Sequence, residues 1–372
     1  MSKIIPVTRS SMPPLEEYVE LLQGVWDSRR LTNFGRLHEE LEQRLKEYLG
    51  VSHLALFSNG HTALEIALST LPKIPKGEII TTAYSFCSTV NAIVRSGYTP
   101  VFCDIKETDF TINPELIEQK ITPKTVAVVA THVYGFPCDD KAISDIAKRH
   151  KLKVIYDAAH AFGVKYKGMG IAGFGDISML STHATKVFHT IEGGILCTRD
   201  AETAKKAREL SNFGFSDEGE LTCPGPNAKM NEFEAAMGIC NLRYIDGEIN
   251  KRKIAAERYI ERLSGKAGIY VPIPSDDTVW NYAYFPVLFD GAGDTRDKVA
   301  DRLTAQSIMP RKYFSPALHL TECYRSKYKD ISLPVTERVA EQILTLPLYA
   351  ELTTADVDRI CDIILYKGVF SK

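Results

Sequence analysis

Short apolar runs rich in β-branched residues alternate with segments of helical spacing along the first 160 residues of the chain. This alternation is typical of βαβ units and predicts a mainly parallel sheet covered by helices. Beyond residue 160 two apolar runs follow each other with little helix between them, which predicts a local antiparallel pairing within the sheet. The seven predicted strands are 53–60 (with its closing glycine turn), 77–82, 99–105, 125–135, 152–160, 176–182 and 193–199.

A long helical pattern follows these strands. Residues 231–265 keep helical spacing throughout, which predicts one long helix or two in line, with Gly265 as the C-cap. Long helices of this kind often join two domains, and 372 residues are too many for one minimal core. We therefore expect a large domain over residues 1–245, including an N-terminal arm, and a small C-terminal α/β domain over residues 246–372.

Composition and charge narrow the class of protein. The formal net charge is −2, so the chain carries no electrostatic footprint for nucleic acid or an anionic membrane. The N-terminal segment has no signal-peptide core, and no apolar run is long enough to cross a bilayer, so the expected location is the cytoplasm. The eight cysteines form no C-x-x-C pair. We expect neither a structural disulfide nor a zinc site.

Two charged residues occupy positions that suit cofactor chemistry. Asp157 ends the strand predicted at 152–160, and carboxyl ends of parallel strands are where α/β sheets hold ligands. Lys186 lies in a polar turn between two predicted strands. Taken singly, Lys186 fits a surface-loop lysine and Asp157 a helix cap. Together they fit pyridoxal phosphate (PLP), which needs an amine to hold its aldehyde and a carboxylate beside its ring nitrogen.

A phosphate site and a ring-stacking site are also predicted. Gly60 follows a predicted strand and precedes a helix, where free N–H groups bind phosphate and glycine lets the anion approach. His61 lies beside it, and Ser181 could add a hydroxyl. Phe86 follows the strand at 77–82 and could stack on the cofactor ring. The alternatives are a plain turn glycine and a core aromatic.

Taken in order, the motifs resemble those of the DegT/DnrJ/EryC1/StrS family of PLP-dependent sugar aminotransferases. The resemblance covers essentially the whole chain. It implies the aspartate aminotransferase fold (PLP fold type I), an α/β architecture whose large domain has a mainly parallel seven-stranded sheet and whose small C-terminal domain is α/β. The motifs that carry the resemblance are IPVTRSSMPPLEE, LTNFG, SNGHTAL, TTAYSF, THVYG, DAAHAFG, S-x-HATK, EGG, NAKMNEFEAAMG, RKYFSPALH and LPLY.

The resemblance assigns roles around the cofactor ring. It implies that Lys186 is the lysine that holds PLP as a Schiff base and that Asp157 is the partner of the pyridinium nitrogen. His160 takes the place of the family's Gln or His near the phenolic oxygen of the ring. Phe86 matches the aromatic residue that stacks on the ring.

The resemblance also assigns the phosphate cradle. Gly60, His61 and Ser181 match its positions, and Asn227 resembles an asparagine that the family sends across a dimer interface to the neighbour's cofactor phosphate. A homodimer with shared active sites is therefore implied. One position departs from the family, which usually has threonine where this chain has His61. We expect His61 to supply only its backbone N–H, with Thr62 shifted out of reach.

The same comparison implies a reaction. Some family members have histidine instead of the lysine and are dehydratases, so Lys186 favours transamination. Residues 190–194 read T-I-E-G-G, a pattern found in members that aminate C4 of the sugar, whereas many that aminate C3 read GDGG. The resemblance implies transfer of the amino group of glutamate to C4 of dTDP-4-dehydro-6-deoxyglucose. The alternatives are 3-amination, a UDP- or GDP-linked sugar, and a non-catalytic PLP-binding regulator. Such regulators usually carry a DNA-binding module and a basic patch, and we expect neither here because the sequence offers no spare segment or basic run for them.

Substrate contacts are predicted on two loops. Thr32 and Asn33 lie in the N-terminal LTNFG segment, and Lys312, Tyr313 and His319 lie in or next to RKYFSPALH. Polar and aromatic residues on loops near a site suit a sugar nucleotide. The alternative for all five is ordinary loop and core packing.

Overall fold

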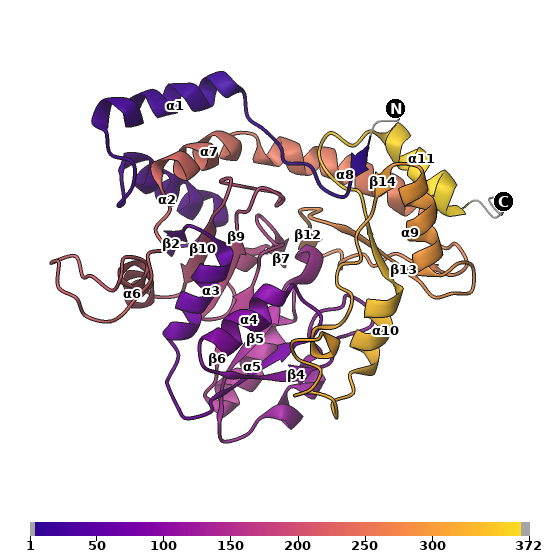
Figure 1. Cartoon of the computed structure of the whole chain (residues 1–372), viewed down its shortest axis with the longest axis horizontal. Coiled ribbons are helices and arrows are strands. Elements are labelled where there is room, and N and C mark those ends of the chain that lie inside the picture. The colour runs from indigo at the N-terminus through magenta and orange to yellow at the C-terminus, as the bar shows by residue number, and fades with distance from the viewer. Residues whose placement is uncertain (1–3, 366–372) are drawn as a thin grey trace.

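A seven-stranded sheet lies at the centre of the computed structural model, which describes residues 4–365 (Figure 1). Its strands are β2 (His53–Phe57), β3 (Glu78–Thr82), β4 (Thr99–Cys103), β5 (Thr125–Thr131), β6 (Lys153–Asp157), β9 (Ile177–Ser181) and β10 (Gly194–Thr198). They follow the order β2-β10-β9-β6-β5-β3-β4. β10 is antiparallel to both of its neighbours, and the other pairs are parallel. The predicted sheet and its local antiparallel pairing are confirmed.

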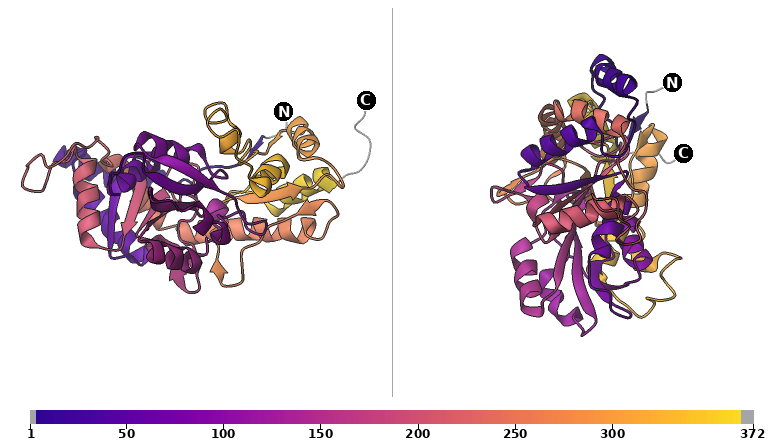
Figure 2. Two further views of the ribbon diagram at one scale, coloured as in Figure 1. Left: turned by 90° about the horizontal axis from the view of Figure 1, so that it is seen from below. Right: turned by 90° about the vertical axis from the view of Figure 1, so that its left-hand side faces the viewer.

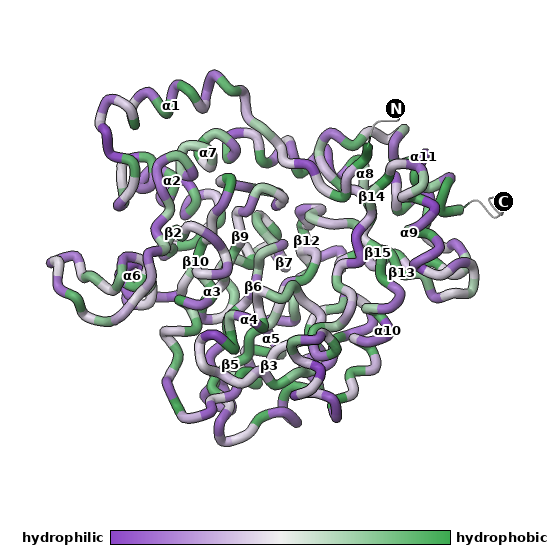
Figure 3. Tube along the Cα trace, viewed as in Figure 1, coloured by the Kyte–Doolittle hydropathy of each residue, from purple (hydrophilic) through white to green (hydrophobic). Residues whose placement is uncertain are grey.

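Helices cover both faces of this sheet. They are α2 (Arg36–Leu49), α3 (Gly60–Ser69), α4 (Cys87–Arg95), α5 (Asp140–His150), α6 (Ala201–Ser211) and α7 (Glu232–Leu242). Because successive strand residues point to opposite faces, Val128 and Ala130 of β5 enter one core and Ala127 and Val129 the other. Residues of α3, α4 and α6 close the Ala127 core, and residues of α2, α5 and α7 close the Val128 core. Most of the strand residues are buried, and the middle of each strand is largely apolar, as expected for a sheet that is covered on both faces (Figure 3).

Polar N-cap side chains bind the first turn of four of these helices, α3, α5, α6 and α7. The side chain of Asn59 accepts the N–H of Thr62 at the start of α3, and Asp139 and Asp200 cap α5 and α6 in the same way. Asn231 forms a capping box at the start of α7. Caps of this kind satisfy N–H groups that have no acceptor within the helix. They place the turns between strand and helix, where the candidate site lies.

The predicted helical stretch at 231–265 forms two helices in line, α7 and α8 (Ile245–Leu263), which lie end to end in Figure 1. Gly265 follows the C-cap of α8 with φ of +70°, a conformation that favours glycine. The antiparallel sheet of the C-terminal part lies beside the large sheet, toward one end of the molecule (Figure 2). This part contains β11 (Ile269–Tyr270), β13 (Phe285–Phe289), β14 (Ile308–Met309), β15 (Ile343–Leu346), α9 (Arg296–Ala305), α10 (Pro334–Gln342) and α11 (Thr354–Leu365).

Several short elements connect the two parts of the chain. The N-terminal strand β1 (Ile5–Pro6) pairs with β14, and β12 (Thr278–Val279) pairs with β7 (Lys165–Tyr166), which also pairs with β8 (Met169–Gly170). One hydrophobic core continues from the large sheet into the C-terminal part. The domain division at residue 245 therefore stays a prediction. The remaining elements are α1 (Leu15–Ser28) and 3-10 turns at Pro114–Leu116, Glu118–Lys120, Val133–Gly135, Ile171–Gly173 and Leu318–Leu320.

No helix within residues 4–365 has both the length and the apolar character needed to cross a bilayer.

Candidate active site

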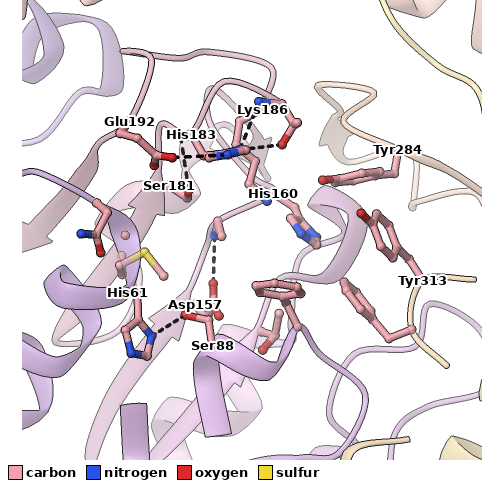
Figure 4. Close-up of a pocket in the computed structure, with 18 residues that line it drawn as sticks. His61, Ser88, Asp157, His160, Ser181, His183, Lys186, Glu192, Tyr284 and Tyr313 are labelled. Carbon is pink, nitrogen blue, oxygen red and sulfur yellow. Dashed lines mark hydrogen bonds and ion pairs between the residues drawn. The ribbon is translucent and has the colours of Figure 1, made fainter. Parts of the chain in front are cut away.

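A pocket of about 450 Å³ opens at the carboxyl ends of β2, β5, β6 and β9, where α/β sheets hold their ligands (Figure 4). The turn after β2, the segment that starts α4 and the loop between β9 and β10 form most of its wall. The C-terminal part adds aromatic rings. The predicted site residues that the pocket brings together are Gly60, His61, Phe86, Asp157, His160, Ser181, Lys186 and Tyr313.

Lys186 lies in the middle of the loop that connects β9 to β10. This loop is closed at its base, where the hydroxyls of Thr182 and Thr190 are 2.6 Å apart and the Thr190 N–H donates to the Thr182 carbonyl at 2.8 Å. Gly193 completes the base, because a Cβ there would collide with both threonine hydroxyls. Lys186 is half-buried, and its amine lies 5.7 Å from the ring centroid of Tyr284. The two ends of the loop that carries the Lys186 amine are therefore held together by hydrogen bonds and close packing.

Asp157 is a buried carboxylate held by two donors. Thr89 Oγ1 donates to Oδ2 at 2.5 Å, and the Ala159 N–H donates to Oδ1 at 3.1 Å. Burial raises the pKa of Asp157 above its usual range, although the hydrogen bonds from Thr89 and Ala159 and the charge of Lys186 act against the rise. Among the cationic side chains that the structure describes, Lys186 is the one whose charge lowers the pKa of Asp157. The site therefore suits a ligand that brings its own positive charge to Asp157.

His160 lies in the pocket as a neutral imidazole. Its Nδ1 accepts the Tyr134 N–H at 3.0 Å, which leaves the proton on Nε2. Burial is the main cause that lowers the pKa of His160 well below its usual range, and the charge of Lys186 adds to it. The ring stacks on Phe314 with centroids 5.9 Å apart and planes 7° apart. His160 can therefore donate one hydrogen bond to a ligand without carrying charge.

Phe86 presents an open ring face to the pocket. It precedes the first residue of α4, and 55% of its surface is exposed although it lines a cavity. Its nearest aromatic neighbour is Phe314, with centroids 6.4 Å apart. A large apolar ring left uncovered in a pocket is suited to stacking on a flat ligand.

The start of α3 offers unpaired backbone donors. Gly60 and His61 are the first two residues of the helix, so their N–H groups have no acceptor within it. Asn59 accepts the N–H of Thr62 at 2.8 Å, which leaves the earlier donors for an anion. A Cβ on Gly60 would lie 3.1 Å from the Cβ of Ser181, so glycine lets β9 approach this turn. The Ser181 hydroxyl lies on the same wall of the pocket.

The imidazole of His61 also lies in the pocket wall, beyond what was expected from its backbone alone. Its Nδ1 lies 2.8 Å from the Ser88 hydroxyl, and its Nε2 lies 3.4 Å from Glu65. Thr62 is outside the pocket lining, and Asn59 caps its N–H. The side chain of His61 therefore turns toward α4.

These groups fit PLP. The free N–H groups of α3 suit its phosphate, Phe86 suits its ring, and the buried Asp157 carboxylate suits its ring nitrogen. The Lys186 amine lies at the same pocket.

The predicted substrate residues fall into two groups. Tyr313 lines the pocket, whereas Thr32, Asn33 and Lys312 lie outside it, with the Lys312 amine 2.7 Å from Asp297. Their substrate role stays a prediction.

His319 requires a correction. Its side chain is fully buried outside the pocket, where its Nε2 lies 3.1 Å from Glu337 and its ring lies 6.1 Å from that of Phe102. The core-packing alternative describes it, because a side chain without exposed surface cannot touch a sugar in this arrangement.

Asn227 is exposed and lies away from the pocket of its own chain. Its amide oxygen accepts a hydrogen bond from the Lys229 amine at 2.8 Å. Its role toward a neighbouring subunit stays a prediction.

Several pocket residues were not predicted. Glu192 and His183 lie 3.5 Å apart across the mouth of the Lys186 loop. Both belong to motifs that carry the family resemblance, S-x-HATK and EGG, so the sequence held a signal that could have identified them as site residues. Tyr284 comes from the segment that leads into β13, far along the chain, and Ser88 lies in the first turn of α4. No local pattern distinguishes either of these two from a packing residue.

Comparisons with known proteins agree with this geometry. A model of the DegT/DnrJ/EryC1/StrS aminotransferase family matches residues 15–365. A curated protein of Escherichia coli named dTDP-4-amino-4,6-dideoxy-D-glucose transaminase is 42% identical over 374 residues, covering 98% of this chain and 99% of its own.

Two solved structures are similar over most of the chain. The structure of DesI in the presence of its TDP-sugar product has a TM-score of 0.92 and 33% identity, covering 98% of this chain and 93% of its own. The structure of NtdA from Bacillus subtilis with bound cofactor PMP has a TM-score of 0.85 and 31% identity, covering 94% of this chain and 81% of its own.

Proposed function

Because this chain belongs to the DegT/DnrJ/EryC1/StrS aminotransferase family and is a PLP-dependent sugar aminotransferase of fold type I, we propose that it aminates C4 of dTDP-4-dehydro-6-deoxyglucose. Glutamate is the proposed donor, and the products are the 4-amino-4,6-dideoxy sugar and 2-oxoglutarate. One observation carries the catalytic part: the Lys186 amine, the buried Asp157 carboxylate and the free N–H groups of α3 share one pocket. The name of the 42% identical relative and the T-I-E-G-G segment support C4 and dTDP.

The chemistry divides between cofactor and protein. Bound PLP supplies an electron sink that makes the α-proton of an amino acid acidic. Lys186 Nζ would hold the cofactor through its aldehyde. The same nitrogen, once free as an amine, would be the base that takes the α-proton of the amino acid and the acid that returns a proton, and it would act in the reverse order toward C4 of the sugar.

The other residues hold the cofactor in place. The Asp157 carboxylate, oriented by Thr89 and Ala159, would keep the ring nitrogen protonated. Neutral His160 would donate its Nε2–H to the phenolic oxygen. Gly60 and the neighbouring N–H of α3 would bind the phosphate.

We further propose that the active unit is a homodimer in which Asn227 reaches the partner's phosphate site. Asn227 is exposed, and it follows a loop whose large apolar residues Phe213, Phe215 and Leu221 are also exposed. Apolar side chains gathered on one surface are typical of an interface. A cytoplasmic location and a role of the product in O-antigen lipopolysaccharide are proposed from the sequence alone.

The test begins with absorption spectra of purified protein before and after glutamate, with Lys186→Ala alongside. The wild type should show a visible band that moves to the near ultraviolet with glutamate, and the variant should lack this response. A wild type without any such band after added PLP would refute the catalytic proposal.

Substrate choice needs a second experiment. The glutamate-loaded enzyme is mixed with 4-keto-6-deoxy and 3-keto-6-deoxy sugars linked to dTDP, UDP or GDP, and the new C–N bond is located by NMR. Amination at C3, or faster turnover of a UDP- or GDP-linked sugar, would support the alternatives.

A further inference from the structure

The N-terminal arm, residues 4–14, runs from the C-terminal part to α1 (Figure 1), and on the way it contacts the Lys186 loop. Its first half is anchored on the C-terminal part. β1 pairs with β14, the Val7 carbonyl accepts the Leu348 N–H at 3.0 Å, and Arg9 forms an ion pair with Glu351 at 2.8 Å. The next two residues of the arm then contact the loop.

These contacts lie on both sides of Lys186 in the sequence. Ser10 Oγ donates to the Ala184 carbonyl at 2.7 Å, and His189 Nε2 lies 2.6 Å from the Ser11 carbonyl. A carbonyl oxygen only accepts, so His189 donates from Nε2. The arm thus binds the loop two residues before Lys186 and three residues after it.

His189 is itself held in this orientation. It is buried, its Nδ1 accepts the Ile191 N–H at 3.3 Å, and the amide of Asn241 on α7 donates to its carbonyl at 2.9 Å. On the arm side, Ser11 Oγ donates to Glu248 of α8 at 2.5 Å. Both partners of the His189–Ser11 contact are therefore tied to helices.

The half of the loop before Lys186 is held mainly by hydrogen bonds within itself. The His183 Nδ1 lies 2.8 Å from the Thr185 hydroxyl, and the Lys186 N–H donates to the His183 carbonyl at 2.9 Å. The half after Lys186 is buried, with the Phe188 ring stacked on that of Phe162 at a centroid distance of 4.3 Å. The arm supplies hydrogen bonds from outside to both halves. A small displacement of a catalytic group can lower the reaction rate strongly, so restraints on the position of this loop are expected to affect the rate.

We propose that Ser10 and His189 are positioning residues, and that the arm is a strap that fixes the Lys186 loop so that the lysine amine meets the reacting carbon. The proposal rests on the proposed function of Lys186. It assigns to the IPVTRSSM segment a role in catalysis that acts through the loop and needs no contact between the arm and either substrate.

The first test uses the apoprotein and needs no turnover. Hydrogen–deuterium exchange is measured for peptides covering residues 183–191 in the wild type, Ser10→Ala, His189→Leu and His189→Gln. Exchange should quicken about two- to tenfold in Ser10→Ala and His189→Leu, the effect of one lost hydrogen bond, and His189→Gln should restore part of the protection through its amide donor. Lys141→Gln is the matched control, because it removes an exposed ion pair with Asp145 on α5 that touches neither the arm nor the loop.

The second test uses the PLP-loaded enzyme. In Ser10→Ala, kcat should fall about two- to tenfold with KM for both substrates unchanged, and the pH at which the visible band changes should shift. Lys141→Gln should match the wild type in both kcat and KM. Unchanged exchange and unchanged kcat in Ser10→Ala and His189→Leu would overturn the proposal, as would equal losses in Lys141→Gln. A wild type that neither binds PLP nor turns over would instead refute the proposed function. The exchange data on the apoprotein would still show whether the arm restrains the Lys186 loop.

Discussion

Replacing Thr89 with valine removes one hydrogen bond from the Asp157 carboxylate and changes little else. Valine has nearly the shape of threonine, and both Thr89 and Asp157 are buried. A hydrogen bond to an ionised group contributes about 1.5–3 kcal/mol. We therefore expect Thr89→Val to lower the free energy of unfolding of the apoprotein by that amount, about 1.5–3 kcal/mol, near neutral pH.

The effect should depend on pH. Burial already raises the pKa of Asp157 above that in the unfolded chain, and Thr89 partly offsets the rise. Between the two pKa values the folded state holds a proton that the unfolded state has released, so stability falls as pH rises through that window. Thr89→Val extends the window upward. The stability lost in the variant should be largest near neutral pH and should shrink as pH falls toward the ordinary carboxyl pKa.

Urea denaturation of the apoproteins, followed by tryptophan fluorescence over a series of pH values, measures this difference. Thr81→Val is the matched control, because Thr81 is buried on β3 and its hydroxyl has no hydrogen-bond partner among the described residues. It should be neutral or slightly stabilising. In an Asp157→Asn background the Thr89→Val loss should be smaller and independent of pH. If Thr89→Val destabilises no more than Thr81→Val, or equally at every pH, Thr89 does not stabilise the charged form of Asp157.

Three further substitutions test other features. Gly60→Ala puts a Cβ 3.1 Å from that of Ser181, so PLP should bind the apoprotein about tenfold more weakly in a fluorescence titration; unchanged affinity would argue against a cradle at this turn. Gly247→Ala, in α8 with open space around the new Cβ, should raise the free energy of unfolding by about 0.5–1 kcal/mol in urea, whereas a loss would point to an unseen contact. His319→Gln should leave KM for the sugar within about twofold, because His319 is buried against Glu337 outside the pocket; a large rise in initial-rate measurements would restore its substrate role.

The residues that could be predicted lie where local patterns change. Asp157 follows a run of apolar strand residues, so the end of the strand and the edge of the sheet could be located together. Gly60 follows another such run and begins a helix. In both cases the position in the fold follows from the alternation of strand and helix, which a few neighbouring residues determine.

The residues that could not be predicted depend on contacts between distant segments. Tyr284 enters the pocket only because the C-terminal part packs against the end of the large sheet. The prediction that His319 contacts substrate was wrong, although Tyr313 of the same RKYFSPALH segment does line the pocket. The chain turns into the core after Tyr313, and Glu337 and Phe102 enclose the imidazole. Distance in sequence does not measure distance to the site once the backbone turns inward.

The antiparallel strand β10 has a consequence for the order of folding. β10 pairs on one side with β9, the strand that precedes it in the chain, and on the other side with β2, which lies far earlier in the sequence. Contacts between segments close in sequence form with a smaller loss of chain entropy, so the β9–β10 hairpin and its lysine loop should form before β2 docks. The turn proposed to bind phosphate follows β2, and it meets the lysine loop only when the pairing of β2 with β10 closes. Recovery of cofactor capture during refolding should therefore lag behind the first appearance of sheet structure and report completion of the large sheet.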